Sequence, residues 1–283
     1  MLTTVTAGPY TVRGISVGGV YTSLAVPELR LGLDAGAPLR SSAGIDTILL
    51  SHGHADHVGA LPALLGIRGL SGKTRPLRVA MPAEIQADLT SALAALSRLQ
   101  RFPLEIEAIG LHPGDELALR GDLRIRAVRT FHPVPSLGYV VVRRVAKLKG
   151  QFQGLTGPQI AALRRGGENV TEHEDRIELA YVTDTLISAF DHAPELYAAG
   201  TLIMECTFLD GRKSLDAARA GCHIHLDEVI ERADRFANTH VVMMHFSQVY
   251  RPDEIPGILD ARLPPALRKK VIPFIPDGPH WPG

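Results

Sequence analysis

The sequence contains almost no cysteine and no apolar run long enough to cross a bilayer. Cys206 and Cys222 are its only cysteines, which excludes the disulfide framework of a small secreted domain. A membrane-spanning helix needs about 20 consecutive apolar residues, and the sequence offers no such stretch. The first residues also lack the basic start and apolar core of a secretory signal. We therefore expect a soluble, cytoplasmic protein whose thiols stay reduced.

The sequence has no excess of either charge. Lys and Arg together number 30, and Asp and Glu together also number 30, so no overall field attracts nucleic acid or an acidic partner. Phosphate groups would have to be bound by a local cluster of cations or by metal ions. No linker and no internal repeat divides the 283 residues. This pattern predicts a single domain over residues 1–283.

Strand-like and helix-like segments alternate along the chain. Apolar, β-branched runs predict strands at residues 12–20, 29–33, 47–50, 104–109, 123–128, 138–142, 177–182, 201–204 and 240–244. Helices are predicted at residues 82–101, at 226–236 and after Pro252. In the first helix Pro82 would take the first position, and we expect the face formed by Ile85, Leu89, Leu93, Leu96 and Leu99 to be core. This alternation favours an α/β protein with two sheet-and-helix halves.

A cluster of metal-binding residue types follows the predicted strand at 47–50. His52, His54, Asp56 and His57 lie within six residues, and alternate residues share one face of a strand. His57 can join the others only if the chain turns or starts a helix at Asp56. Imidazole suits zinc, iron and nickel, and the carboxylate accepts harder ions, so the cluster predicts a transition-metal site that could hold two ions. The alternatives are a histidine-rich surface loop and hydrogen-bonded core histidines.

Three more candidate ligands follow later strand-like runs. His132, Asp184 and His245 each come directly after an apolar segment, as residues do when strands deliver ligands to one edge of a sheet. A single residue in such a position is more often a cap or a turn residue. Together with the cluster, however, the three supply the number of ligands that two metal ions need.

The order of these residues resembles the metallo-β-lactamase superfamily and, within it, ribonuclease Z, which trims the 3′ end of precursor tRNA. Leu33-Asp34-Ala35-Gly36 is similar to the family's Asp-x-Gly turn, Glu205-Cys206-Thr207-Phe208 to its Glu-Ala-Thr-Phe segment, and His245-Phe246-Ser247 with Tyr250 to its last metal motif. The resemblance implies an αββα sandwich. It also implies a dinuclear centre, with zinc as the expected metal and manganese or iron as alternatives.

The resemblance also implies roles for individual residues. His52, His54 and His132 would bind the first ion, Asp56, His57 and His245 would bind the second, and Asp184 would bridge them. Asp56 would also accept a proton from the attacking water. Glu205 would orient His223 toward the scissile phosphate or the leaving group. Both could instead be structural, with Glu205 a buried acid and His223 or His225 a residue at a helix N-terminus.

The sequence departs from the family pattern in parts expected to contact RNA. Ile224-His225 replaces the Ser-Thr that follows the family's histidine at His223, Val249 stands where an arginine is usual, and no Gly-Thr-Gly loop is visible at residues 14–20. The tRNA-binding arm, at about residues 143–170, is short. Its cations could form a phosphate-binding channel beside the site or a solvated charged face; they are Arg143, Arg144, Lys147, Lys149, Arg164 and Arg165.

Three functions are compatible with the sequence. The first is a dimetal phosphodiesterase that cleaves precursor tRNA or a smaller phosphodiester, and that forms a homodimer as family members commonly do. The second uses the same metals to hydrolyse a carboxylic ester, a thioester or a lactone, because the fold alone does not fix the substrate. The third is a non-catalytic binding module, which is difficult to reconcile with so complete a set of ligands.

Overall fold

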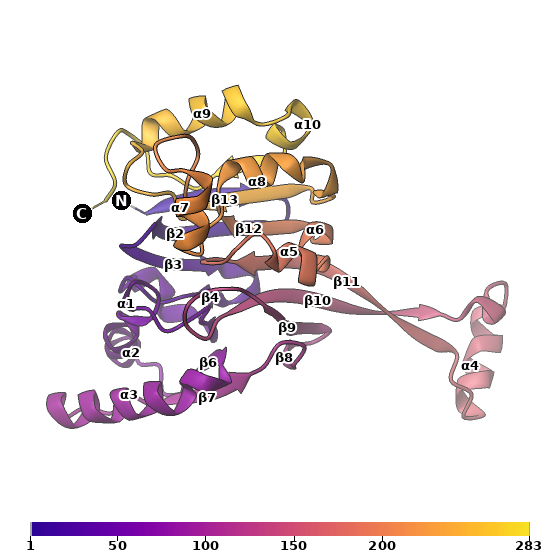
Figure 1. Cartoon of the computed structure of the whole chain (residues 1–283). Helices are drawn as coiled ribbons and strands as arrows, with labels where there is room; N and C mark the ends of the chain where they lie inside the picture. The colour runs from indigo at the N-terminus through magenta and orange to yellow at the C-terminus, as the bar shows by residue number, and fades with distance from the viewer. Residues whose placement is uncertain (1, 283) are drawn as a thin grey trace.

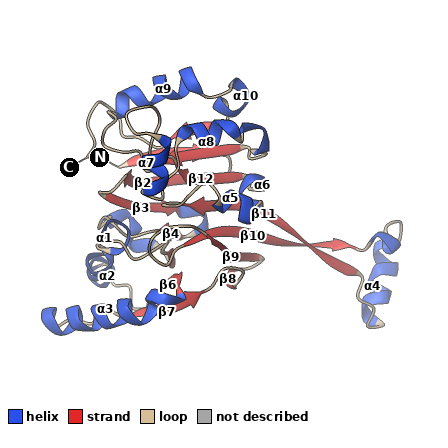
Figure 2. Cartoon of the chain, in the orientation of Figure 1, coloured by secondary structure: helices blue, strands red, loops and turns tan. Residues whose placement is uncertain are grey.

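Two seven-stranded sheets pack face to face in the computed structural model, which describes residues 2–282. Helices cover the two outer faces (Figures 1 and 2). The first sheet contains, in spatial order, β1 (Thr3–Ala7), β2 (Tyr10–Val17), β3 (Tyr21–Val26), β4 (Leu31–Leu33), β5 (Thr47–Leu49), β6 (Leu77–Pro82) and β7 (Ile106–Leu111). The predicted αββα sandwich is confirmed.

The second sheet is built from the later part of the chain. Its order is β14 (Val271–Pro273), β13 (His240–Met244), β12 (Thr201–Glu205), β11 (Thr171–Val182), β10 (Leu137–Leu148), β9 (Leu123–Arg129) and β8 (Glu116–Arg120). Strands β4 to β7 are parallel to one another, and so are strands β11 to β14. The carboxyl ends of these parallel strands are therefore the places where each sheet can present functional side chains.

The described residues form ten α-helices. They are α1 (Ala55–Val58), α2 (Leu61–Leu70), α3 (Gln86–Gln100), α4 (Gly157–Arg165), α5 (Ala189–His192), α6 (Glu195–Ala198), α7 (Leu215–Ala220), α8 (Leu226–Glu231), α9 (Ile255–Arg262) and α10 (Pro265–Arg268). All but α4, which lies at the tip of a two-stranded ribbon, flank the sheets or lie at their edges (Figure 1). None of the described helices has both the length and the apolar character that crossing a membrane requires.

The apolar core has three layers, as a four-layer sandwich requires. Leu33 and Leu49 of the first sheet pack with Val141 and Ile203 of the second in a layer between the sheets. A second layer lies between the first sheet and the helices α2 and α3. A third layer lies between the second sheet and the helices α5, α6, α8, α9 and α10. The middle layer fixes the two sheets against each other and so fixes the relative positions of residues that follow their strands.

Three details of the sequence prediction are wrong. The first predicted helix begins later than expected, because Pro82 ends β6 and a short 3-10 turn at Ala83–Ile85 precedes α3. Only part of its apolar face is core: Leu93 is buried, whereas Leu99 is 79% exposed, because α3 runs on beyond the edge of the sheet (Figure 1). The predicted strand at 12–20 is also interrupted, since β2 ends at Val17 and the chain turns at Gly19, where φ is +71°.

Strands β10 and β11 continue beyond the second sheet as a two-stranded ribbon that carries α4 (Figure 1). We call residues 143–176 the arm. Its strands remain paired from Arg143 opposite Arg176 to Leu148 opposite Thr171. The arm leaves at the end of β10 remote from Leu137, beside the β8–β9 turn, where the N–H of Arg144 donates to the carbonyl of Asp122. Its role in RNA binding stays a prediction, as does the single-domain assignment.

The arm does not carry the basic channel beside the metal site that the sequence suggested. Arg143 pairs with Asp122 and Glu178, Arg144 pairs with Asp175, and Lys147 pairs with Glu174. Cross-strand register places Arg144 opposite Asp175, whereas Lys147 lies opposite Glu172 and pairs diagonally with Glu174. These three cations of the ribbon are therefore neutralised, while the other three predicted cations, Lys149, Arg164 and Arg165, make no ion pair among the described residues. The ribbon also leaves the sheet at the end remote from the cluster at His52.

Candidate metal centre

The cluster at residues 52–57 lies where β5 ends and α1 begins. The turn that the sequence requires at Asp56 is the start of α1, with His54 as the residue that precedes the helix and the N–H of His57 donating to the carbonyl of His54. His52 and His57 are fully buried, whereas His54 is exposed and Asp56 is partly exposed. The change from extended to helical backbone brings His57 back to the same site as His52.

The second sheet brings the remaining candidates to the same place. His132 follows β9, Asp184 follows β11 and His245 follows β13. All seven predicted ligands take part in groups whose donor atoms lie within 4.8 Å of one another. The groups are His52, His54 and His132; His52, His57 and Asp184; Asp56, His57 and His245; and Asp184, His223 and His245.

Three imidazole nitrogens converge on one side of the centre. The Nδ1 atom of His54 lies 3.0 Å from Nε2 of His52 and 3.2 Å from Nε2 of His132. Burial, together with the neighbouring imidazoles, lowers the pKa of the His52 side chain to about 2. His52 is therefore neutral at physiological pH, the form in which imidazole binds a metal.

Asp184 lies between the two sides of the centre. Its Oδ1 atom is 3.5 Å from Nε2 of His57 and 3.3 Å from Nε2 of His245, and its Oδ2 atom is 3.9 Å from Nε2 of His52. Burial alone would raise the pKa of this carboxyl, but the charges of His245 and His57 hold it well below its usual range. Asp184 is thus an ionised carboxylate with one oxygen facing each side.

A buried carboxylate behind the cluster orients two of the histidines. Asp34 follows β4, and its Oδ2 atom accepts hydrogen bonds from Nδ1 of His57 at 2.7 Å, from the hydroxyl of Ser51 at 2.8 Å and from the hydroxyl of Tyr181 at 2.6 Å. The Ser51 hydroxyl in turn lies 2.9 Å from Nδ1 of His52. With Nδ1 of both rings directed at this network, each ring turns Nε2 toward the centre.

A second network orients His245 from the opposite side. Its Nδ1 atom lies 3.0 Å from the Thr207 hydroxyl, which donates to Oε2 of Glu205 at 2.5 Å. The other oxygen of Glu205 lies 3.3 Å from Nδ1 of His223. Burial disfavours the charged imidazole of His223, but the Glu205 carboxylate outweighs burial and raises the pKa of His223 to about 9.

The two histidines at 223 and 225 have different positions. His225 is the N-terminal cap of α8: its Nδ1 atom accepts from the N–H of Asp227 at 3.2 Å. His223 instead stacks on His245 with ring centroids 5.4 Å apart, and its side chain is 21% exposed. The structural alternative therefore describes His225, and His223 lies at the rim of the centre. The sequence signal that separates them is Asp227-Glu228, an acidic first turn that follows His225.

Sequence reasoning gave no role to the residues that orient the ligands. Asp34 belongs to the Asp-x-Gly turn, which by itself predicts no contact with the ligands, and the sequence predicts no role for Ser51 or Thr207. One signal was available for Asp34: like the candidate ligands, it follows an apolar strand, Leu31–Leu33. Ser51 and Thr207 carried no such signal because serine and threonine occur at most strand ends and turns.

The side chains present fit divalent metal ions. The Nε2 atoms of His57 and His245 are buried and have no hydrogen-bond partner among residues 2–282, which is costly for a polar atom unless it has another ligand. Both point toward the Asp184 carboxylate. Imidazole nitrogens and carboxylate oxygens form the donor set of borderline transition metals. Bound metal ions would therefore provide the partner that these two buried nitrogens lack within residues 2–282.

Three residues of the centre have a left-handed backbone. The φ angles are +58° at Asp34, +43° at Asp184 and +60° at His245, values that side-chain-bearing residues adopt at a cost of about 1–2 kcal/mol each. In each case the residue follows a strand and the chain turns sharply. Backbone strain of this kind concentrates at functional sites.

Removing bound metal should lower the thermal stability of the protein. A ligand at 100 times its dissociation constant stabilises the native state by about 2.7 kcal/mol, which corresponds to a Tm shift of roughly 5–10 °C for a chain of this size. Calorimetry with and without a chelator measures the shift, and adding back the metal is the control. An unchanged Tm after metal removal, verified by elemental analysis, would show that the buried nitrogens have no such ligand.

Comparisons with known proteins identify the family to which the chain belongs. Residues 22–155 match the family model described as the β-lactamase superfamily domain. A tRNase Z of Arabidopsis thaliana is 34% identical over 265 residues, which cover 93% of this chain and 94% of the relative. The chloroplastic tRNase Z of the same plant is 33% identical over 94% of this chain and 75% of its own length.

A solved structure agrees on the fold. The short form of human tRNase Z superposes with a TM-score of 0.57 at 16% identity and covers 88% of this chain and 93% of its own. The plant relatives match nearly the whole chain at about a third of its positions, so the similarity extends beyond the fold to the sequence. The chain belongs to the tRNase Z family, a group of metal-dependent hydrolases in the β-lactamase superfamily.

Proposed function

We propose that this protein is a dinuclear endoribonuclease that cleaves precursor tRNA at its 3′ end. The observation that carries the proposal is the ring of histidine and aspartate side chains around the buried carboxylate of Asp184, with the His223–Glu205 pair at its rim. Relatives named tRNase Z over most of the chain support phosphodiester hydrolysis. They favour it over the hydrolysis of an ester, a thioester or a lactone.

The proposed ligand sets follow the two sides of the centre. His52, His54 and His132 would hold one ion, and Asp56, His57 and His245 would hold the other. Asp184 would bridge, because its two oxygens face opposite sides. Zinc suits a site with five imidazoles better than manganese does, since nitrogen donors favour zinc and oxygen donors favour manganese. When bound, such ions lower the pKa of water and offset negative charge at phosphorus.

The chain's own residues supply proton transfer and orientation. Asp56 is partly exposed at the start of α1, so it can accept the proton of an attacking water and pass it to solvent. Glu205 holds Nδ1 of His223, which leaves Nε2 of that ring free to contact the phosphate or to donate a proton to the leaving oxygen. Asp34 and Thr207 keep the buried rings fixed during the reaction.

The arm supports a proposal of a homodimer. It leaves the second sheet at the end of β10, whereas Leu137 at the start of β10 lies beside the cluster, with Ser136 bridged to His52. An arm that projects from the opposite end extends away from the centre of its own chain (Figure 1). In a dimer it would hold RNA that is cut in the partner's centre. A sedimentation measurement that finds only monomer at enzyme concentrations active on RNA would contradict this arrangement.

Cleavage of a precursor tRNA that carries a 3′ trailer tests the proposed function. We expect a single cut at the trailer junction, dependent on added divalent metal, with product ends mapped at nucleotide resolution. The His223→Ala variant should retain its metal and lose roughly 10²–10⁴-fold in turnover, as expected for a lost proton donor. His225→Ala is the matched control, because that ring caps α8. Turnover of thioester or lactone substrates without RNA cleavage would reject the proposal.

A further inference from the structure

A cavity of about 510 Å³ opens at the edge opposite the metal centre. Three neighbouring parallel strands, β4, β5 and β6, begin there: Arg30 precedes β4, Asp46 precedes β5 and Arg75 lies just before β6. The metal-site residues follow the other ends of the same strands, since Asp34 comes after β4 and His52 after β5. With about 3.3 Å per residue in a strand, the two sites lie on the order of 15 Å apart.

The cavity is lined mainly by cations. We call it the basic cavity; its charged lining consists of Arg30, Arg68, Lys73, Arg75, Arg78 and Arg120, together with the carboxylate of Asp46. Six positive side chains against one negative side chain stand out in a protein whose charges balance at 30 each. A concave surface lined by one sign of charge concentrates its field and attracts counter-ions.

Four of these cations have no carboxylate partner among the described residues: the buried Arg68 and the exposed Lys73, Arg75 and Arg120. Arg30 pairs with Asp46, which also lines the cavity. Arg78 pairs with Glu107, which does not line it. Lys73 and Arg75 make no ion pair within residues 2–282. Arg120 donates only to the backbone carbonyl of Glu28. Here the cavity differs from the ribbon of the arm, where Arg143, Arg144 and Lys147 each pair with a carboxylate.

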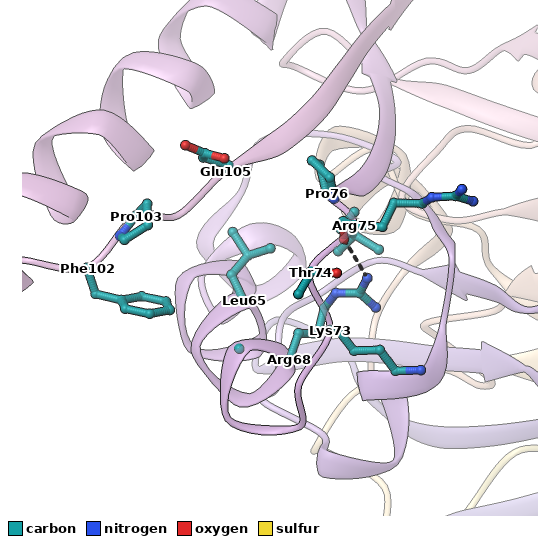
Figure 3. A pocket seen from close by; sticks show the side chains of 11 residues that line it. Leu65, Arg68, Lys73, Thr74, Arg75, Pro76, Phe102, Pro103 and Glu105 are labelled. Atoms are coloured by element: carbon teal, nitrogen blue, oxygen red, sulfur yellow. Dashed lines mark hydrogen bonds between the residues drawn. The ribbon is translucent and has the colours of Figure 1, made fainter.

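A buried arginine fixes the loop that presents Lys73 and Arg75. The guanidinium of Arg68 donates to the carbonyls of Ala43, Ile45 and Arg75, so it joins the end of α2 to the chain before β5 and β6. Figure 3 draws an adjoining pocket that shares Arg68, Lys73 and Arg75 with the basic cavity, and it shows this bond from Arg68 to Arg75. Lys73 and Arg75 extend away from Phe102 and Pro103, which line only the adjoining pocket. Arg68 is only 6% exposed. The two unpaired cations therefore project from an anchored loop.

We propose that the basic cavity binds phosphate groups. The unpaired cations come from both sheets, with Lys73 and Arg75 before β6 and Arg120 at the end of β8. A ligand that bridges them must carry at least two separated negative charges. A phosphodiester backbone meets this requirement, and so does a free polyphosphate. Asp46 and Glu107 are already neutralised by Arg30 and Arg78, so they oppose such a ligand only weakly.

The RNA substrate is one source of these phosphates, and this part rests on the proposed function. The arm and the basic cavity lie at the same edge: Arg120 ends β8 two residues before Asp122, whose carboxylate binds Arg143 at the base of the arm. RNA held by the arm would pass the cavity. A free polyphosphate, such as the triphosphate of a nucleotide, is the other source, and it needs no arm.

The test uses a double variant that carries both Lys73→Ala and Arg75→Ala. It is compared with a control variant that loses the same two charges elsewhere on the surface. Arg98→Ala with Lys269→Ala serves as the control, because both residues are exposed and neither lines the cavity. Affinity for a mature tRNA without a trailer is measured over a range of salt concentrations, so cleavage is not required. Tripolyphosphate binding is measured by calorimetry on the same proteins.

We expect the double variant to lose about tenfold in tRNA affinity and to reduce the salt slope by roughly 1.5, the value for two lost phosphate contacts, with the control unchanged. Loss of tripolyphosphate binding with normal tRNA affinity would support the free polyphosphate as the source. If both ligands bind the double variant and the control equally, the basic cavity is not a phosphate site. Failure of trailer cleavage would reject the proposed function alone, because neither binding measurement depends on it.

Discussion

Replacing Asp184 by Ala should remove at least one metal equivalent and lower kcat/KM for RNA cleavage by a factor of about 10³ or more. The carboxylate faces His57 and His245 with one oxygen and His52 with the other, so no other side chain can hold both sides of the centre together. A two-metal reaction depends on this bridge for the spacing of its ions. The loss of the buried charge also leaves three imidazoles facing one another without compensation.

Elemental analysis and single-turnover cleavage measure the two effects separately. Asp88→Ala is the control, since Asp88 is an exposed acid on α3 and makes no ion pair within residues 2–282. Asp184→Asn adds a second comparison, because it keeps the volume and the tolerance for a left-handed backbone while it removes the charge. Full metal content in the Asp184→Ala variant would show that the two sides of the centre bind their ions independently. That result would contradict the assignment of Asp184 as the bridging ligand.

Replacing Asp34 by Ala should destabilise the protein by about 3–5 kcal/mol, the cost of removing one partner from a buried charged network. Four donors lose their acceptor: the backbone N–H and the hydroxyl of Ser51, Nδ1 of His57 and the hydroxyl of Tyr181. Asp34 is 2% exposed, so water cannot replace the carboxylate without opening the core. The rings of His52 and His57 also lose their orientation, which should weaken metal binding 10–100-fold.

Urea denaturation of the metal-free protein isolates the stability effect, and titration with a competing chelator measures the metal affinity. Asp34→Asn separates charge from backbone conformation, because asparagine tolerates the φ of +58° at this position. We expect the asparagine variant to fall between the wild type and Asp34→Ala in both measurements. Unchanged metal affinity in Asp34→Ala would mean that the rings are fixed by packing alone.

The sequence was most informative where ligands follow strands. His132, Asp184 and His245 were predicted because each ends an apolar run, and the carboxyl ends of parallel strands meet at one edge regardless of how far apart they lie in the chain. The turn at Asp56 was predicted from geometry alone, since His57 could not otherwise share a face with His52. The structure places the donor atoms of all of them within 4.8 Å of their neighbours.

The sequence was least informative where long-range packing decides. Periodicity extended the apolar face of α3 to Leu99, but the sheet beneath the helix ends before that residue, which is 79% exposed. The cations of the arm were visible, while their neutralisation depends on which strand lies opposite them, as with Arg144 and Asp175. The basic cavity was not predicted at all, because its cations come from segments as distant as Arg30 and Arg120.

The left-handed turns at the metal centre position functional side chains but add backbone strain, which lowers the stability of the fold. Asp34, Asp184 and His245 each hold a conformation that glycine would adopt without strain. Glycine would relieve about 1–2 kcal/mol of strain at each position, but at Asp34 the loss of four buried hydrogen bonds would cost more than this relief. In a descendant of this protein that no longer catalyses the reaction, Asp184 and His245 should therefore be among the first positions to change, whereas Asp34 should persist. Glycine at Asp184 and His245 beside an unchanged Asp34 would identify such a descendant.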